Sequence, residues 1–99
     1  MNQMITVEIT TIMGLKALMG GNKDQSLTLS DGATVAEALD QLCKTYGLPL
    51  HERIFNDAQQ LNPGIVVFVN GCVIFALDGL ETPLQDGDAV LIFPPVGGG

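Results

Sequence analysis

The chain has 99 residues, enough for one small domain with a single core, and its 46% hydrophobic content excludes a disordered polypeptide. Its net charge is −7 and no Lys or Arg follows Arg53, which disfavours nucleic acid and favours a basic protein partner, although acidity that only promotes solubility gives the same pattern. No apolar run is long enough to span a membrane and no signal peptide begins the chain, so we expect a cytoplasmic protein without a membrane partner.

The first predicted elements are two strands. In residues 3–12, "QMITVEITTI", the β-branched residues Ile5, Val7 and Ile9 alternate with polar ones, which is typical of a half-buried strand. Residues 26–30, "SLTLS", alternate in the same way and predict a second strand that returns beside the first. The glycine-containing segment between them predicts a loop or a short helical turn.

A helix over about residues 34–46 is the clearest prediction. Thr34 and Glu37 form the spacing of a capping box, and Gly47 followed by Pro49 marks the end of the helix. Six residues recur at helical spacing and predict one buried stripe: Val35, Ala38, Leu39, Leu42, Cys43 and Tyr46. The segment that follows, through Gly64, has no clean period and predicts a loop.

Three strands are predicted in the last third of the chain. Residues 65–69, "IVVFV", are apolar throughout, and Asn70-Gly71 is a strong signal for a two-residue hairpin turn. Residues 72–77 predict the returning strand, residues 78–88 a turn-rich link, and residues 89–93, "AVLIF", the final strand.

The order strand, strand, helix, strand, strand, strand predicts an α+β roll, in which the one main helix packs on one face of the sheet. The two apolar strands, residues 65–69 and 89–93, also place hydrophobic side chains on the other, open face of the sheet. That patch is either a surface for a partner or is covered by the chain's own loops, for which residues 13–24 and 47–63 are the candidates. The pattern alone leaves these alternatives open.

No independent active site or metal site is indicated, so we expect no catalysis by this chain alone. The two cysteines predict free thiols, with Cys43 in the core and Cys72 half-buried in a strand. His51 stands apart from any nucleophile and predicts a surface loop residue. Asp86 and Asp88 flank Gly87, a pattern that indicates a turn more than a cation site.

The last six residues, 94–99, predict a flexible tail after a domain formed by residues 1–93. Pro94 and Pro95 cannot donate to a sheet ladder and hold the root of the tail extended. The terminal glycines lack side chains and can enter a narrow channel, where the α-carboxylate of Gly99 is the reactive group once it has been activated. A glycine-rich end can also be a plain disordered terminus.

The ending "FPPVGGG", residues 93–99, resembles the MoaD/ThiS family of ubiquitin-like sulfur carriers. In the MoaD branch of that family the chain ends in FPPVxGG, with Gly97 here at the variable position. The segments 82–96, "TPLQDGDAVLIFPPV", and 67–71, "VFVNG", are also similar to the family. The resemblance spans essentially the whole chain and implies a β-grasp fold with a mixed sheet.

The resemblance also implies a chemistry for the tail. A MoeB/ThiF-like enzyme would adenylate the carboxylate of Gly99 with MgATP, and a sulfur donor protein would convert it to a thiocarboxylate. In the MoaD branch the tail then enters a MoaE-like large subunit and donates sulfur in molybdopterin synthesis. The chain itself would hold no cofactor or metal. By the motif, the residues that enter the partner are Pro94, Pro95, Val96, Gly97 and Gly98.

Family members contact the activating enzyme through the apolar sheet face, which makes Phe68, Phe75 and Phe93 candidates for the partner surface. The chain is longer than the smallest MoaD proteins, and the resemblance to longer MoaD-like chains also allows tungsten-cofactor assembly or the thiolation of tRNA or metabolites. A sulfur carrier for thiamine, tRNA or another thiolation is therefore an alternative. A modifier that is conjugated to lysines through Gly99 is another alternative function. A plain β-grasp interaction module with an inert tail is a third.

Overall fold

The computed structural model describes residues 3–12, 15–21 and 24–93 and contains a mixed sheet of five strands. Across the sheet the strands lie in the order β2-β1-β5-β3-β4. Their bounds are Met4–Thr11 for β1, Asp24–Ser30 for β2, Val66–Val69 for β3, Cys72–Val73 for β4 and Ala89–Phe93 for β5.

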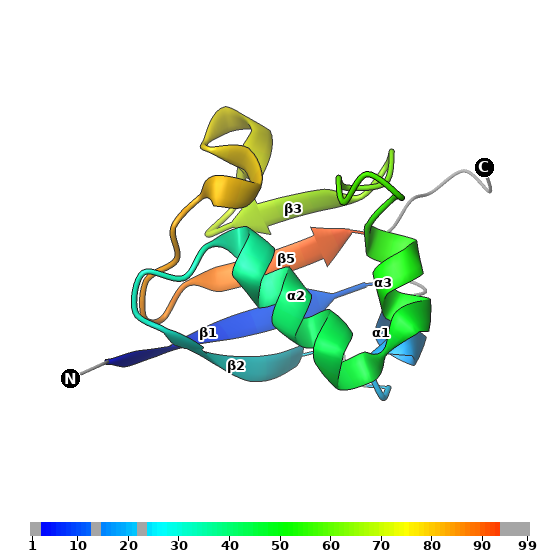
Figure 1. Ribbon diagram of the computed structural model, residues 1–99. Helices are drawn as coiled ribbons and strands as arrows, with labels where there is room; N and C mark the ends of the chain where they lie inside the picture. The colour runs from blue at the N-terminus through cyan, green and yellow to red at the C-terminus, as the bar shows by residue number, and fades with distance from the viewer. Residues whose placement is uncertain (1–2, 13–14, 22–23, 94–99) are drawn as a thin grey trace.

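The last described strand, β5, lies in the middle of the sheet. It runs parallel to β1, with Ile92 opposite Thr11, and antiparallel to β3, with Phe93 opposite Val66. The outer pairs, β1 with β2 and β3 with β4, are antiparallel hairpin partners. Helix α2, Val35–Tyr46, crosses one face of this sheet (Figure 1), which confirms the predicted α+β roll.

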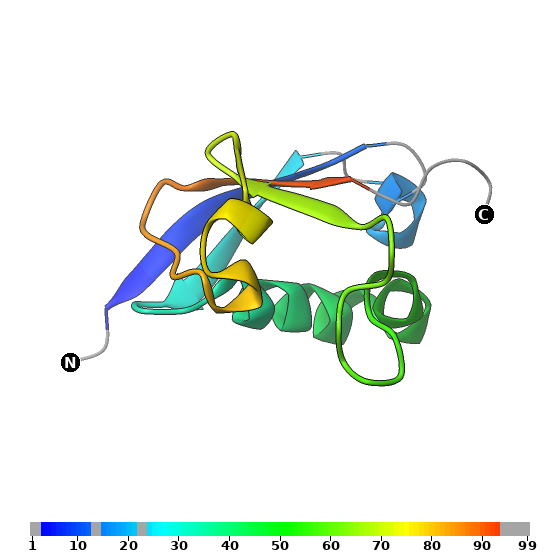
Figure 2. The same cartoon turned by 90° about the horizontal axis from the view of Figure 1, so that it is seen from above.

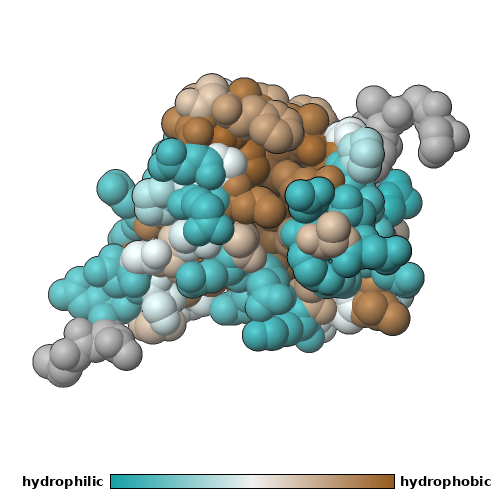
Figure 3. All heavy atoms as spheres, turned by 45° about the horizontal axis from the view of Figure 1, so that its top comes forward, coloured by the Kyte–Doolittle hydropathy of each residue, from teal (hydrophilic) through white to brown (hydrophobic). Residues whose placement is uncertain are grey.

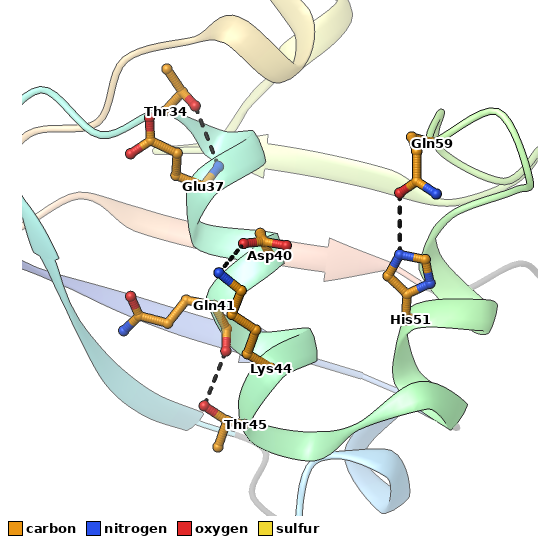
Figure 4. A network of polar contacts seen from close by, with 8 residues as sticks. All are labelled: Thr34, Glu37, Asp40, Gln41, Lys44, Thr45, His51 and Gln59. Carbon is orange, nitrogen blue, oxygen red and sulfur yellow. Dashed lines mark hydrogen bonds and ion pairs between the residues drawn. The ribbon is translucent and has the colours of Figure 1, made fainter.

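Helix α2 begins and ends where the sequence predicts. The Thr34 side chain accepts a hydrogen bond of 3.3 Å from the backbone N–H of Glu37, and Gly47, at φ 93°, donates its N–H to the Cys43 carbonyl. Figure 4 shows the exposed side of the helix, where the Lys44 and Asp40 side chains form an ion pair of 3.0 Å. Both ends therefore have local partners for backbone groups that a helix leaves unpaired.

The core lies between the sheet and the helices. The five buried residues of α2 are those of the predicted stripe other than Tyr46, which is half-buried. The Tyr46 hydroxyl donates to the Gln25 side chain at 2.8 Å. The strands contribute Ile5, Val7, Ile9, Leu27, Leu29, Val67, Val69, Val90 and Ile92.

The prediction of a loop after α2 is wrong, because residues Leu48–Ile54 form a second helix, α3. Gly47 ends α2 and also precedes α3, so the chain changes direction at one residue. Pro49 blocks the continuation of α2, yet a proline suits the first turn of a new helix. Leu50 and Ile54 anchor α3 in the core. A short helix α1, Leu15–Leu18, fulfils the prediction of a helical turn between the first two strands.

The predicted returning strand over residues 72–77 is largely wrong. Only Cys72 and Val73 pair with β3, and the chain then enters two 3₁₀ turns, η1, Ile74–Ala76, and η2, Gly79–Glu81. The reason is that Ile74 is buried. The chain bends away from the sheet edge at this residue to bring its side chain into the core.

Segment 47–63 does not cover the open face of the sheet. Seen from above in Figure 2, α3 lies beside α2 on the same side of the sheet. Helix α1 contacts α3, and its Leu15 is fully buried in the same core. The alternative in which this segment folds over the open face is therefore wrong. Among the described residues, no helix combines the length and apolarity that a membrane span requires.

Candidate functional site

The structure describes the part of the sheet that directly precedes the C-terminal tail. Strand β5 ends at Phe93, the last described residue. The predicted tail residues lie outside the described residues: Pro94, Pro95, Val96, Gly97, Gly98 and Gly99. What the structure places is the surface around the end of β5.

Half-buried hydrophobic side chains gather on the open face of the sheet beside β5. Buried and half-buried residues alternate along β3 and β5, as expected for strands that are covered on one face only. Directly paired residues share a face, so the pairing places five of them together. This set, the apolar half of the open face, consists of Val66, Phe68, Val73, Leu91 and Phe93.

The structure brings together two of the three phenylalanines that the sequence singled out. The rings of Phe68 and Phe93 lie 5.5 Å apart between centroids, in an edge-to-face arrangement. They border a depression of about 470 Å³ that is also lined by Thr10, Gly71, Ala89, Val90 and Leu91. The depression is therefore lined by Phe93, the residue that directly precedes the tail.

Phe75 lies elsewhere. It is 74% exposed on η1 and lines a separate groove at the β3 edge, together with residues 60–66 and Leu80. The three phenylalanines therefore belong to two surfaces. Leu91, Val66 and Val73 complete the apolar half and were not singled out from the sequence. The position of the Asn70-Gly71 turn could have found Val66 and Val73, because it fixes which side chains of the hairpin share a face, whereas Leu91 lies on β5, outside that hairpin.

Hydrogen bonds connect the hairpin turn between β3 and β4 to the start of β5. Asn70 and Gly71 both have positive φ, 51° and 83°, as a two-residue turn of this type requires. The Asn70 side chain accepts a hydrogen bond from the Ala89 N–H and donates one to an Asp88 carboxylate oxygen, both at 2.9 Å. The backbone N–H of Asn70 donates to the Ala89 carbonyl. This network holds β3 and β5 in register beneath the apolar half.

Asp86 and Asp88 form a turn, as predicted. Asp86 accepts a hydrogen bond from the Thr6 N–H at 2.8 Å, and Asp88 accepts one from the Gln85 N–H at 2.9 Å. Both carboxylates thus bind donors of the protein itself. Within the ranges that the structure describes, no group of three or more His, Cys, Asp or Glu side chains is placed to hold a metal ion.

The two thiols differ in environment. Cys43 is buried in α2, as predicted, and burial together with the nearby negative charge of Asp40 raises its pKa to about 11. Cys72 is exposed, so the prediction of a half-buried strand cysteine is wrong. It follows the Asn70-Gly71 turn on an edge strand only two residues long, which leaves it without covering neighbours.

His51 is not a loop residue as predicted, but lies half-buried on α3. Its Nε2 is 3.3 Å from the Gln59 side-chain oxygen (Figure 4), and its ring packs near that of Phe55. Asn62 donates from its side-chain amide to the carbonyls of Glu52 and Arg53 at the end of the helix. These contacts hold the segment after α3 against that helix and indicate a structural role for this region.

Comparisons with known proteins agree with this architecture. The model of the ThiS family matches residues 14–99. Small archaeal modifier protein 3 of Haloferax volcanii is 40% identical over 79 residues, which cover 80% of this chain and 84% of the relative.

Two solved structures extend the comparison. The crystal structure of SAMP1 from Haloferax volcanii superposes with a TM-score of 0.80 at 29% identity, over 95% of this chain and 99% of that one. A chain of the BexX/CysO complex from Amycolatopsis orientalis gives 0.77 at 30% identity, over 94% and 99%. These similarities confirm the ubiquitin-like β-grasp fold, and the chain belongs to the ThiS family of ubiquitin-like sulfur carriers and modifiers.

Proposed function

We propose that the chain carries sulfur as a thiocarboxylate on Gly99 and donates it in molybdopterin synthesis, as the small subunit of a MoaD–MoaE type synthase. The observation that carries this proposal is the extent of the family match, which runs to Gly99 and includes the ending "FPPVGGG". That ending follows the form typical of the MoaD branch.

The chemistry requires an activating enzyme, because a carboxylate is a poor electrophile. The Gly99 carboxylate attacks the α-phosphate of MgATP on a MoeB/ThiF-like enzyme, and pyrophosphate leaves. Sulfide, or the sulfur of a donor protein, then attacks the acyl-adenylate, and AMP leaves. With sulfide as donor the product is the thiocarboxylate and one proton is released. ATP and Mg²⁺ belong to the activating enzyme, and this chain contributes the carboxylate.

The apolar half of the open face contributes recognition of the enzyme. The apolar half of the open face lies beside the end of β5, so an enzyme that receives the tail meets Phe68 and Phe93 at the same time. Aromatic side chains at the centre of an interface often dominate its energy. The absence of Lys and Arg after Arg53 favours a basic enzyme surface around the contact.

The experiment that tests sulfur carriage is an intact-mass measurement of the whole chain. It is incubated with a MoeB-like enzyme, MgATP and sulfide, and we expect the mass gain of one oxygen exchanged for sulfur. Deletion of Gly99 should abolish the gain and leave the circular dichroism spectrum unchanged. A mass gain that persists in the deletion variant, or no gain with an enzyme that loads its own carrier, contradicts the proposal.

The acceptor is tested separately. The loaded chain is mixed with a MoaE-like subunit and precursor Z, and we expect molybdopterin to form with stoichiometric return of the carboxylate. A loaded chain that transfers no sulfur in this mixture, while an authentic MoaD does, refutes the molybdopterin role and leaves sulfur carriage intact.

A second function, protein modification, is favoured by the relative in Haloferax volcanii, which is named a modifier protein. In that case the activated Gly99 carbonyl forms an isopeptide bond with a lysine amine and AMP leaves. Denaturing gels of cells that express a tagged chain separate the two functions. Conjugates that vanish when Gly99 is deleted indicate a modifier, whereas a pure carrier gives no covalent ladder.

A further inference from the structure

A second apolar surface lies at the outer edge of β3. It is a groove of about 360 Å³ between the segment 60–65 and the η1–η2 stretch, and its apolar lining includes Leu61, Pro63, Ile65, Ile74, Phe75 and Leu80. We refer to it as the edge groove. In Figure 3 this edge is turned forward. Hydrophobic residues gather over it, with hydrophilic residues on either side. Phe75 is the most exposed large hydrophobic side chain among the described residues, at 74%.

The strand that borders the edge groove lacks a strand partner along part of its length. β4 pairs with Phe68 and Val69 only, so Val66 and Val67 have none on that side. The backbone N–H of Asn70 points to β5, where it bonds to the Ala89 carbonyl. Because the direction of backbone groups alternates along a strand, the N–H and C=O of Val67 point away from β5, to the outer edge. Val67 is 0% exposed, so these groups are covered, and a ligand in the groove contacts its apolar lining and not the strand edge.

The charges around the edge groove have one sign. No Lys or Arg occurs between Ile54 and Phe93, which includes both segments that form the groove. Asp78 and Glu81, both exposed, flank the η2 turn at its rim. A bound segment with Lys or Arg beside an apolar side chain is therefore complementary in both charge and polarity.

We propose that the edge groove binds an extended segment of a partner protein, in which an apolar side chain lies between basic residues. The apolar side chain of the segment contacts Phe75 and Leu80, which line the groove. This surface shares only Val66 with the apolar half of the open face, and neither Phe68 nor Phe93 lines it, so its use does not depend on the fate of Gly99. A second copy of the chain is disfavoured as occupant, because two acidic rims would meet. The chain's own C-terminus is disfavoured by the same repulsion, since it ends in a carboxylate.

The first test is an NMR titration of the full ¹⁵N-labelled chain. The probe is a capped synthetic peptide with a Val-Leu-Val centre between pairs of lysines, and the matched control peptide has serines at the centre. We expect saturable shift changes that cluster on the amides of Leu61, Phe75 and Leu80 with the first peptide only. The Kd should lie below about 1 mM, as a short apolar anchor with charged flanks allows.

Matched variants distinguish binding in the edge groove from nonspecific hydrophobic binding. Phe75→Ser should weaken binding of the peptide by about tenfold, as truncation of a central aromatic anchor does. Leu48→Ser removes another exposed hydrophobic side chain, 65% exposed on α3, and should leave the Kd unchanged. Neutralising the rim with Asp78→Asn and Glu81→Gln should weaken binding several-fold and reduce its dependence on salt.

Four results of the titration would overturn the proposal. They are shift changes centred on Phe68 and Phe93, equal binding of both peptides, a Phe75→Ser variant that binds as tightly as the native chain, and no binding at millimolar peptide. Sedimentation of the free chain tests the other occupant. A dimer that Phe75→Ser dissociates would assign the groove to a second copy and refute the partner segment.

Discussion

On the open face of the sheet, strands β1 and β2 present mainly polar side chains, with Met4 as an exposed hydrophobic exception, whereas β5, β3 and β4 present mainly half-buried hydrophobic ones. In the polar half, Ser26 donates to Glu8 at 2.7 Å and Thr10 donates to Asp24 at 2.8 Å, across the strand pair. In the apolar half the corresponding contact is the pair of rings of Phe68 and Phe93. The same pleated face thus changes character between β1 and β5.

The difference teaches where this small protein retains apolar surface outside its core. The other face of the same strands already forms the core, so the apolar half contributes less to folding than its hydrophobicity suggests. Hydrophobic residues gathered on one half of an open face indicate contact with another molecule. The polar half supplies matched positions at which the same substitutions should have small effects.

The largest expected effect is on partner recognition. Phe68→Ala should lower the rate of thiocarboxylate formation at subsaturating carrier by tenfold or more, because truncation of an aromatic anchor costs about 2 kcal/mol of binding. Thr28→Ala, at an exposed position of β2 in the polar half, should leave the rate within about twofold. Equal rates for the two variants would show that the two halves do not differ in function.

The hairpin turn that supports the apolar half should matter next. Asn70→Ala removes two side-chain hydrogen bonds and leaves an unsuited residue at φ 51°, so we expect a loss of about 2 kcal/mol in urea unfolding. Asn70→Gly relieves the backbone strain but not the lost bonds, and should recover about half of the loss. A full recovery would mean that the contacts with Asp88 and Ala89 contribute nothing.

The two thiols provide a comparison between a buried and an exposed position. At pH 8 a thiol reagent should modify Cys72 at least a hundredfold faster than Cys43, because burial and a pKa of about 11 keep Cys43 protonated. Mass spectrometry of the modified peptides measures the ratio. Comparable rates in the folded chain would contradict the burial of Cys43.

The same pKa predicts a dependence of stability on pH. The pKa of Cys43 is raised from 9.0 to about 11, so the unfolded chain loses its proton first as the pH rises. The stabilisation is full below about pH 9 and is lost as the pH rises towards about 11. Compared with Cys43→Ala, the native chain should lose on the order of 1–2 kcal/mol more over this range in urea unfolding. Parallel pH curves for the two chains would refute the shift.

The smallest expected effect lies in the polar half. Ser26→Ala removes the exposed hydrogen bond to Glu8 and should lower the free energy of unfolding by less than about 0.5 kcal/mol. Urea unfolding at two salt concentrations measures it. A loss as large as that of Asn70→Ala would mean that the polar half is also a structural support.

Sequence patterns predicted the elements whose side chains repeat regularly. Alternation predicted β1 and β2, and the capping box with its apolar stripe predicted α2 almost to the residue. Helix α3 escaped prediction because only Leu50 and Ile54 anchor its seven residues, too few to establish a period. Pro49 was interpreted only as the residue that ends α2, although it also lies in the first turn of α3.

The remaining differences depend on tertiary contacts. β4 stops after two residues because Ile74 turns into the core, and an apolar run does not reveal such a bend. The pairing of Phe68 with Phe93 follows from strand order across the sheet, which the family resemblance implied but local patterns do not contain. The separation of Phe75 from that pair follows from the bend at Ile74, so the edge groove became visible only in three dimensions.

The central position of β5 has a mechanical consequence. An enzyme that draws on the chain beyond Phe93 pulls along the axis of a strand that is hydrogen-bonded to β1 on one side and β3 on the other. Such a force loads both ladders in shear, so that many bonds must break together, whereas an edge strand would peel away one bond at a time. The fold should therefore resist a pull at the end of β5, which suits the proposed transfer of the chain from one enzyme to the next.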